Sequence, residues 1–269
     1  MRLAGFYALA LLAGLLPVLF PGNYFITVVG IAAGLNVILA VGLNLLMGYA
    51  GQISLGHAAF FGIGAYASAI LTTRYAFPPL LALSVGLISA GLIAWLLARP
   101  ILRLHGHYLA MATLGFGIII HVIMVQATGW TGGPDGLTGI PPLILLGWTV
   151  DSDQRWYLVI MAAALLAIGL SLNLVDSRVG RALRAVRGSE FAARMMGIDT
   201  ARAKTQVFVV SALFAAFAGS LFAHQQGFVS PDSFNLGASI DLVIMVVLGG
   251  MASTFGAAFG AIALTLLHQ

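Results

Sequence analysis

The feature that most constrains this chain is the absence of any Asp, Glu, Lys or Arg between Leu3 and Thr73. These 71 residues would make roughly 107 Å of α-helix at about 1.5 Å per residue, against about 30 Å for the hydrocarbon core of a bilayer. The run is therefore long enough for three crossings. Of the whole chain 61% is hydrophobic and 7% charged, whereas about a quarter of the residues in a soluble domain are charged. We therefore predict a membrane protein.

Helices, not strands, are expected to cross the membrane, because the apolar runs rarely show the period-two alternation of a lipid-facing barrel. We predict an all-α, polytopic integral membrane protein, a bundle of about 8–9 spans or half-spans in one domain over residues 1–269. The expected spans are 3–20, 25–46, 57–72, 79–98, 108–127, 156–175 and 205–226. The segment 238–268 predicts either two half-helices or one kinked span and the start of another.

Basic residues indicate the orientation. The loop at about 176–204 carries seven of the 12 Lys and Arg residues against three acids, and the positive-inside rule predicts that it is cytoplasmic. Counting spans outward from it places Arg99, Arg103 and the N-terminus on the same side. Three acids fall on the outer side: Asp135, Asp151 and Asp153. Because basic charge in such a loop follows from membrane insertion, the pI near 9.8 does not indicate a nucleic-acid partner.

A short helix of about two turns is predicted inside this loop. Ser189 can cap its N-terminus, Glu190 and Arg194 form an i, i+4 pair, and Gly197 ends it. Its apolar side, with Phe191 and Met195, has no partner within the loop. Two interpretations stay open: an interfacial anchor on the bilayer, or a knob that docks in a groove on a cytoplasmic partner.

This loop resembles the EAA loop of ATP-binding-cassette importer permeases, whose coupling helix contacts the ATPase. The residues that the resemblance assigns to coupling are Glu190, Phe191, Ala192, Ala193, Arg194, Met195 and Gly197. Segments 42–69, 131–137, 180–187 and 228–253 together are similar to the branched-chain amino-acid permease family, specifically its M-type subunit. The resemblance covers most of residues 25–262.

The resemblance implies an importer of branched-chain or related hydrophobic amino acids in the bacterial inner membrane. Its expected partners are a second, LivH-type permease subunit, two cytoplasmic ATPases, an extracytoplasmic substrate-binding protein and membrane lipid. ATP and Mg²⁺ would bind the ATPases, while this chain binds no cofactor or metal and has no catalytic residues. The absence of G-x-x-x-x-G-K-[ST] and H-E-x-x-H motifs agrees with this. Relatives continue beyond position 269, which is consistent with a truncated C-terminus.

Within the apolar region, "GYAGQISLGHAAFFGIGAY" (48–66) gathers glycines and polar side chains. Loosened backbone at membrane depth is tolerated where it meets protein or a watered cavity, so the stretch is expected to face the permease interior. Candidates for the translocation pathway are Gln52, Ser54, His57, Gly62 and Asp241. The alternative for the first four is helix packing alone. Asp241 could instead be an ordinary first-turn carboxylate.

The loop 129–142 on the outer side is rich in glycine and proline and contains Gly132, Gly133 and Asp135. It is either a stiff connector or part of the surface that meets the binding protein. Two functional alternatives stay open for the chain as a whole. It could be a secondary transporter or channel for a small solute that acts without an ATPase, or, within the family, a permease for urea or another small amide or amino acid.

Overall fold

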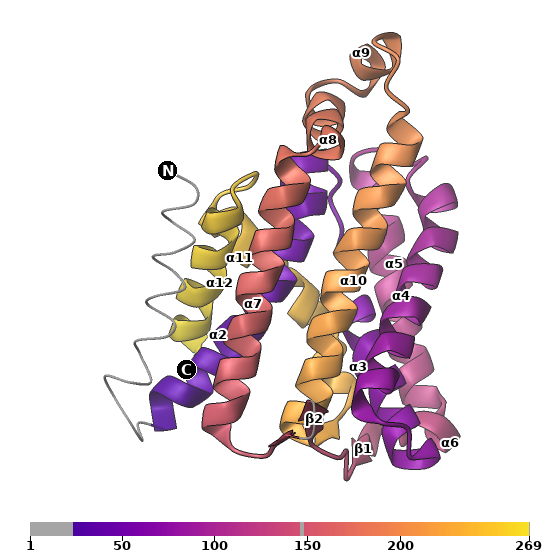
Figure 1. Cartoon of the computed structure of the whole chain (residues 1–269). Coiled ribbons are helices and arrows are strands. Elements are labelled where there is room, and N and C mark those ends of the chain that lie inside the picture. Colours follow the sequence, from indigo (N-terminus) through magenta and orange to yellow (C-terminus); the bar gives the residue numbers. More distant parts are fainter. Residues whose placement is uncertain (1–23, 146–147, 269) are drawn as a thin grey trace.

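The structure is a computed structural model that describes residues 24–145 and 148–268. It is a bundle of helices that run along a common direction, with short elements gathered at the two ends (Figure 1). Five helices of the described residues are long and apolar enough to cross a membrane. They are α2 (Tyr24–Asn44) with its π-helical continuation η1 (Leu45–Tyr49), α4 (Pro79–Ile101), α5 (His107–Gln126), α7 (Asp153–Asp176) and α10 (Thr200–Gln226).

Within the described ranges the bundle also contains three further apolar helices: α3 (His57–Tyr75), α11 (Leu236–Gly249) and α12 (Thr254–His268). The predicted all-α membrane bundle is confirmed, and the predicted ranges from 25 to 226 agree with the helices to within five residues at each end. The predicted span 3–20 lies outside the described residues.

The α3 and α10 helices pack closely at the centre of the bundle. A Cβ atom at Gly64 would clash with the backbone of Ala216, and one at Gly219 would clash with the Phe61 carbonyl. Two polar contacts join the same helices: Ser220 Oγ donates to the Gly64 carbonyl (3.0 Å), and Ser68 Oγ lies 2.8 Å from His224 Nε2. The small residues of α3 therefore make a helix–helix contact, because they let the two backbones approach.

The α2 helix is the most buried of the long helices and packs against α7 and α12. Asn36 Nδ2 of α2 donates to Thr265 Oγ1 of α12 (2.9 Å). Near the other end of α2, Asn44 holds the turn between α11 and α12: its Oδ1 accepts from the Ala252 amide (3.0 Å) and its Nδ2 donates to the Ser253 carbonyl (3.1 Å). The segment 238–268 thus folds as two helices, α11 and α12, which are joined by this turn.

The two ends of the bundle carry different short elements (Figure 1), and they also differ in charge. One end, here called the basic end, carries α8 (Arg178–Gly188) and α9 (Glu190–Met195), with exposed Arg99 and Arg103 nearby. The opposite end, here called the strand end, carries small elements: α6 (Thr128–Thr131), η2 (Gly133–Asp135), β1 (Leu137–Thr138), β2 (Leu143–Leu145), β3 (Trp148–Val150), β4 (Phe228–Val229) and η3 (Pro231–Phe234). There β1 pairs with β4 and β2 with β3, both antiparallel.

Candidate functional site

The α9 helix at the basic end forms as its sequence predicts. Ser189 caps it by accepting a hydrogen bond from the Ala192 amide at 3.2 Å. Gly197, with φ +80°, ends it: the Gly197 amide donates to the Arg194 carbonyl and the Ile198 amide to the Ala193 carbonyl, both at 3.0 Å. A left-handed residue after the last turn is the usual way to satisfy such carbonyls. The predicted cap and stop of this helix are confirmed.

Glu190 lies at the centre of a network of charged groups that joins α9 to α10 and α4. Lys204 Nζ of α10 lies 3.0 Å from each carboxylate oxygen and donates to the Leu102 carbonyl after α4 (2.9 Å). Arg194 Nη2 pairs with Glu190 Oε1, as the i, i+4 spacing predicts, and His105 Nε2 lies 3.2 Å from Oε2. The network fixes the position of α9 relative to two long helices of the bundle.

Burial shapes the ionisation of this network. The Lys204 side chain is 4% exposed and that of Glu190 is 17% exposed. Burial alone would raise the pKa of the Glu190 carboxyl, but hydrogen bonds from Lys204 and Arg194, together with their charges, outweigh it and lower the pKa to about 2. The carboxylate is therefore ionised at neutral pH, and the buried ammonium group of Lys204 has a permanent counter-ion.

The outward side of α9 and its final turn is apolar and uncovered in the described structure. Phe191 is 72% exposed, Met195 70% and Met196 83%, while Ala193 on the inner side is buried. The sequence predicted Phe191 and Met195 on this side, and the structure adds Met196. Here the three residues Phe191, Met195 and Met196 are called the α9 knob. A rigid helix that presents large apolar side chains is suited to a groove on another protein or to a bilayer surface.

The predicted pathway residues of 48–66 are dispersed. Gly51 lies against Arg187 of α8, which places the neighbouring Gln52 at the basic end. Ser54 and His57 are buried, and His57 Nε2 has no hydrogen-bond partner within the described part of the chain. Gly62 packs against Met124 and Phe234, where a Cβ would be crowded. In the described residues Gly62 is thus a packing position, whereas Ser54 and His57 are buried polar side chains.

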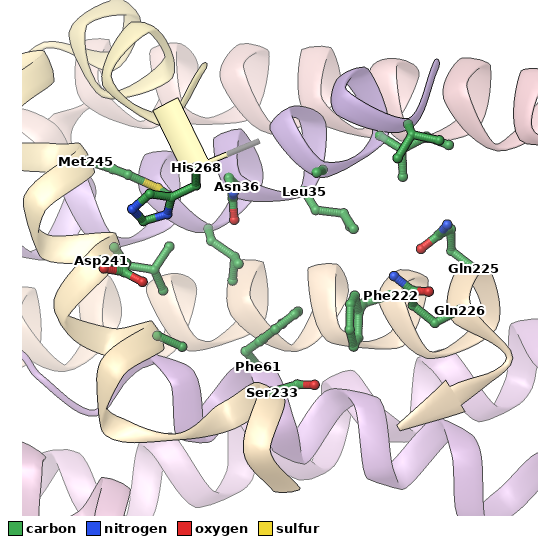
Figure 2. Close-up of a pocket in the computed structure, with 16 residues that line it drawn as sticks. Leu35, Asn36, Phe61, Phe222, Gln225, Gln226, Ser233, Asp241, Met245 and His268 are labelled. Atoms are coloured by element: carbon green, nitrogen blue, oxygen red, sulfur yellow. The ribbon is translucent and has the colours of Figure 1, made fainter. Parts of the chain in front are cut away.

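Asp241 lies apart from them, in a cavity of about 390 Å³ between α2, α10, α11 and α12 (Figure 2). It is the sixth residue of α11, past the first turn, and Asn235 serves as the N-cap by accepting from the Ala238 amide (3.1 Å). The interpretation of Asp241 as a first-turn carboxylate is therefore wrong. Asp241 forms no ion pair with any residue of the ranges 24–145 and 148–268.

The outer-loop residues Gly132, Gly133 and Asp135 lie at the strand end. Gly132 and Gly133 both have left-handed backbone, with φ of +77° and +65°. Thr131 Oγ1 accepts from the Gly133 amide (3.1 Å) and donates to the Met124 carbonyl (2.7 Å), so the turn is tied to α5. Asp135 is exposed. A fixed turn with an exposed acid is compatible with both sequence interpretations, connector and docking surface.

Three residues of these sites were not identified from sequence: Lys204, Gln225 and His268. Lys204 is the only lysine of the chain, and its position near the start of an apolar helix after a basic loop could have indicated a buried partner. Gln225 and His268 line the cavity around Asp241. Their proximity depends on how α10 and α12 pack, which no local pattern specifies.

The family described as "Branched-chain amino acid transport system / permease component" matches residues 25–269, nearly the whole chain. The chain belongs to this family. The described helices and the family thus agree on an integral membrane protein that is a transport component, and the resemblance found in the sequence is confirmed.

Known relatives of this permease differ in what their names say they transport. It is 38% identical over 233 residues to LivM, the high-affinity branched-chain amino acid transport system permease protein of Escherichia coli (strain K12), covering 78% of this chain and 55% of LivM. It is 29% identical over 131 residues to the xylose transport system permease protein XylH of the same strain, covering 47% of this chain and 33% of XylH. It is 27% identical over 196 residues to the autoinducer 2 import system permease protein LsrC of Photorhabdus laumondii, covering 71% of this chain and 54% of LsrC.

The chain spans about half the length of the LivM and LsrC relatives that it matches. No solved structure is a significant match to it.

Proposed function

We propose that this permease is a membrane-spanning subunit of an ATP-driven importer for branched-chain or related hydrophobic amino acids, and that it forms half of the translocation path. Family membership and the 38% identity to LivM support the substrate class. The single observation that carries the mechanism is the α9 knob, three apolar side chains at least 70% exposed on a helix held in place by the Glu190 network.

The proposed arrangement follows from the two ends of the bundle. The basic end faces the cytoplasm, because basic residues are retained on that side during insertion. There the α9 knob docks on one of two ATPase subunits, which bind ATP and Mg²⁺. The strand end, with the Gly132–Asp135 turn, faces the extracytoplasmic binding protein. A second, LivH-type permease subunit completes the path, and the whole chain contributes about 8–9 spans or half-spans to the inner membrane, with its N-terminus inside.

Sidedness can be tested directly, because the chain contains no cysteine. A single cysteine at exposed Ala192 of α9 should react with a membrane-impermeant maleimide in inside-out vesicles but not in intact cells. A single cysteine at exposed Asp135 is the matched control and should show the opposite pattern. Labelling of the Ala192→Cys chain from the outside of intact cells would refute the orientation and with it the docking of an ATPase.

Transport can be tested with the whole complex expressed in a strain that lacks leucine uptake. Phe191→Glu with Met195→Glu places two carboxylates in the proposed apolar contact, and we expect at least tenfold slower leucine uptake and loss of ATPase co-purification. Phe191→Leu keeps the contact apolar and should retain most of the uptake. Uptake that persists without the ATPases, or that stops when only ion gradients are collapsed, would favour the secondary-transporter alternative.

A further inference from the structure

The cavity around Asp241 has a polar end, an apolar middle and an amide end (Figure 2). Asp241 and His268 lie at one end, Leu35, Phe61 and Phe222 in the middle, and Gln225 and Gln226 at the other end. Its volume of about 390 Å³ is within the range of roughly 300–1,000 Å³ typical of small-ligand sites. Mostly apolar walls with a few polar groups at defined places are characteristic of such sites.

The charge in this cavity is unbalanced. Among the described residues that line it, Asp241 is the only carboxylate, and no Lys or Arg lines it. An ionisable side chain is costly at membrane depth, and such groups usually face a ligand path or pair with another charge. Asp241 has no such pair within the described residues, and it does not serve as the cap of α11. A cationic group that enters the cavity would therefore find an uncompensated carboxylate.

The other lining groups match the remaining parts of an α-amino acid. The imidazole of His268 lies at the same end as Asp241 and can donate an N–H to a carboxylate (Figure 2). The aliphatic and aromatic side chains of Leu35, Phe61 and Phe222 lie next to this end and can cover a branched apolar side chain. At the far end, Gln225 Oε1 is buried without a hydrogen-bond partner in the described structure.

We propose that this cavity is a subsite for the transported amino acid and that the Asp241 carboxylate binds its α-ammonium group. The inference rests on the proposed function and goes beyond it, because it assigns recognition of the ligand's charge to a residue of the permease itself. His268 donates to the substrate carboxylate, and the apolar middle of the cavity accepts the side chain. The subsite discriminates against neutral solutes and against acids that lack the amine.

The test uses the complete complex and three variants. Asp241→Asn removes the charge at almost unchanged volume, and Asp241→Glu keeps the charge. Asp176→Asn is the matched control, because Asp176 is an exposed acid at the end of α7 that does not line the cavity. We expect Asp241→Asn to lower the maximal rate of leucine uptake at least tenfold, Asp241→Glu to retain a substantial part of that rate, and Asp176→Asn to behave as wild type. Basal ATPase activity and recovery of the assembled complex should stay at wild-type levels, which separates loss of the subsite from misfolding.

A binding measurement on the complex without its binding protein identifies the group that is recognised. Radiolabelled leucine bound to the wild-type complex in nanodiscs should be displaced by isoamylamine, which has the amine but no carboxylate, more effectively than by 4-methylpentanoate, which has only the carboxylate. In Asp241→Asn this advantage of the amine should disappear. Uptake and competition identical to wild type in Asp241→Asn would overturn the subsite but leave the proposed function intact. A wild-type complex that imports no leucine would instead overturn the proposed function.

Discussion

Replacing Lys204 with methionine removes the central cation of the network that holds α9. The methionine side chain has about the same length as the lysine stem, so it fills the same space next to α4 without the ammonium group. Glu190 would then keep Arg194 and His105 as partners, and the Leu102 carbonyl would lose its 2.9 Å donor. We expect α9 to separate from α10 more often, while the rest of the bundle stays folded.

The size of this effect follows from the pKa of Glu190. Burial would raise this pKa, but the hydrogen bonds and charges of Lys204 and Arg194 lower it from 4.5 to about 2, which corresponds to about 3 kcal/mol. Lys204 supplies part of this stabilisation: losing its hydrogen bond to the charged carboxylate costs about 1.5–2 kcal/mol, and the unpaired Leu102 carbonyl adds about 1 kcal/mol. The total of about 2–3 kcal/mol predicts a roughly 30- to 150-fold larger population of detached α9.

Hydrogen–deuterium exchange of the amides in α9 measures this population. In Lys204→Met the amides of Ala193 and Met196, which are hydrogen-bonded in the wild type, should exchange faster by about that factor, whereas α7 should be unchanged. Arg202→Met removes an exposed cation of the same helix and is the matched control. The double variant Glu190→Gln with Lys204→Met should exchange more slowly than Lys204→Met alone, because it leaves no buried carboxylate that has lost its ammonium partner. Equal exchange in Lys204→Met and wild type would refute the anchoring role of the network.

Two further predictions concern pH and packing. The pKa of Glu190 is lower in the folded than in the unfolded state, so its stabilising effect is complete above about pH 4.5 and is lost as the pH falls toward about 2. Exchange of the α9 amides, corrected for the intrinsic pH dependence, should therefore rise in that window. Gly219→Ala introduces a Cβ against the Phe61 carbonyl and should destabilise the bundle by about 1–3 kcal/mol, seen as a lower melting temperature in detergent. Gly115→Ala in α5, where a Cβ meets nothing within 4 Å, should be neutral or stabilising.

What could be predicted from the sequence was local. The spans follow from apolar length, and the Ser189 cap, the Gly197 stop and the Glu190–Arg194 pair each depend on residues within one or two turns of α9. Lys204 was not identified as the anchor of α9, because its partners are 14 and 102 residues away along the chain. Such a contact depends on how α9, α10 and α4 pack, and no pattern in a single segment encodes it.

The stretch 48–66 shows a second limit of sequence reasoning. A row of small residues predicts close approach to something, but it does not say whether that neighbour is a helix or a watered path. In the structure Gly64 and Ser68 meet α10, and Gly62 meets Met124 and Phe234. Asp241 could be singled out because its charge is unusual in an apolar helix, whereas the rest of its cavity comes from α2, α3, α10 and α12.

The α10 helix connects the two proposed sites. Lys204 in its second turn holds Glu190 of α9, and Phe222 and Gln225 near its other end line the cavity around Asp241. The 27 residues of this helix span about 40 Å at about 1.5 Å per residue. Because α10 packs closely on α3, we expect these two helices to move together. A force applied to the α9 knob therefore reaches the cavity through one rigid element. For this reason we expect Lys204→Met to weaken the coupling of ATP hydrolysis to uptake without changing the amine selectivity that Asp241 provides.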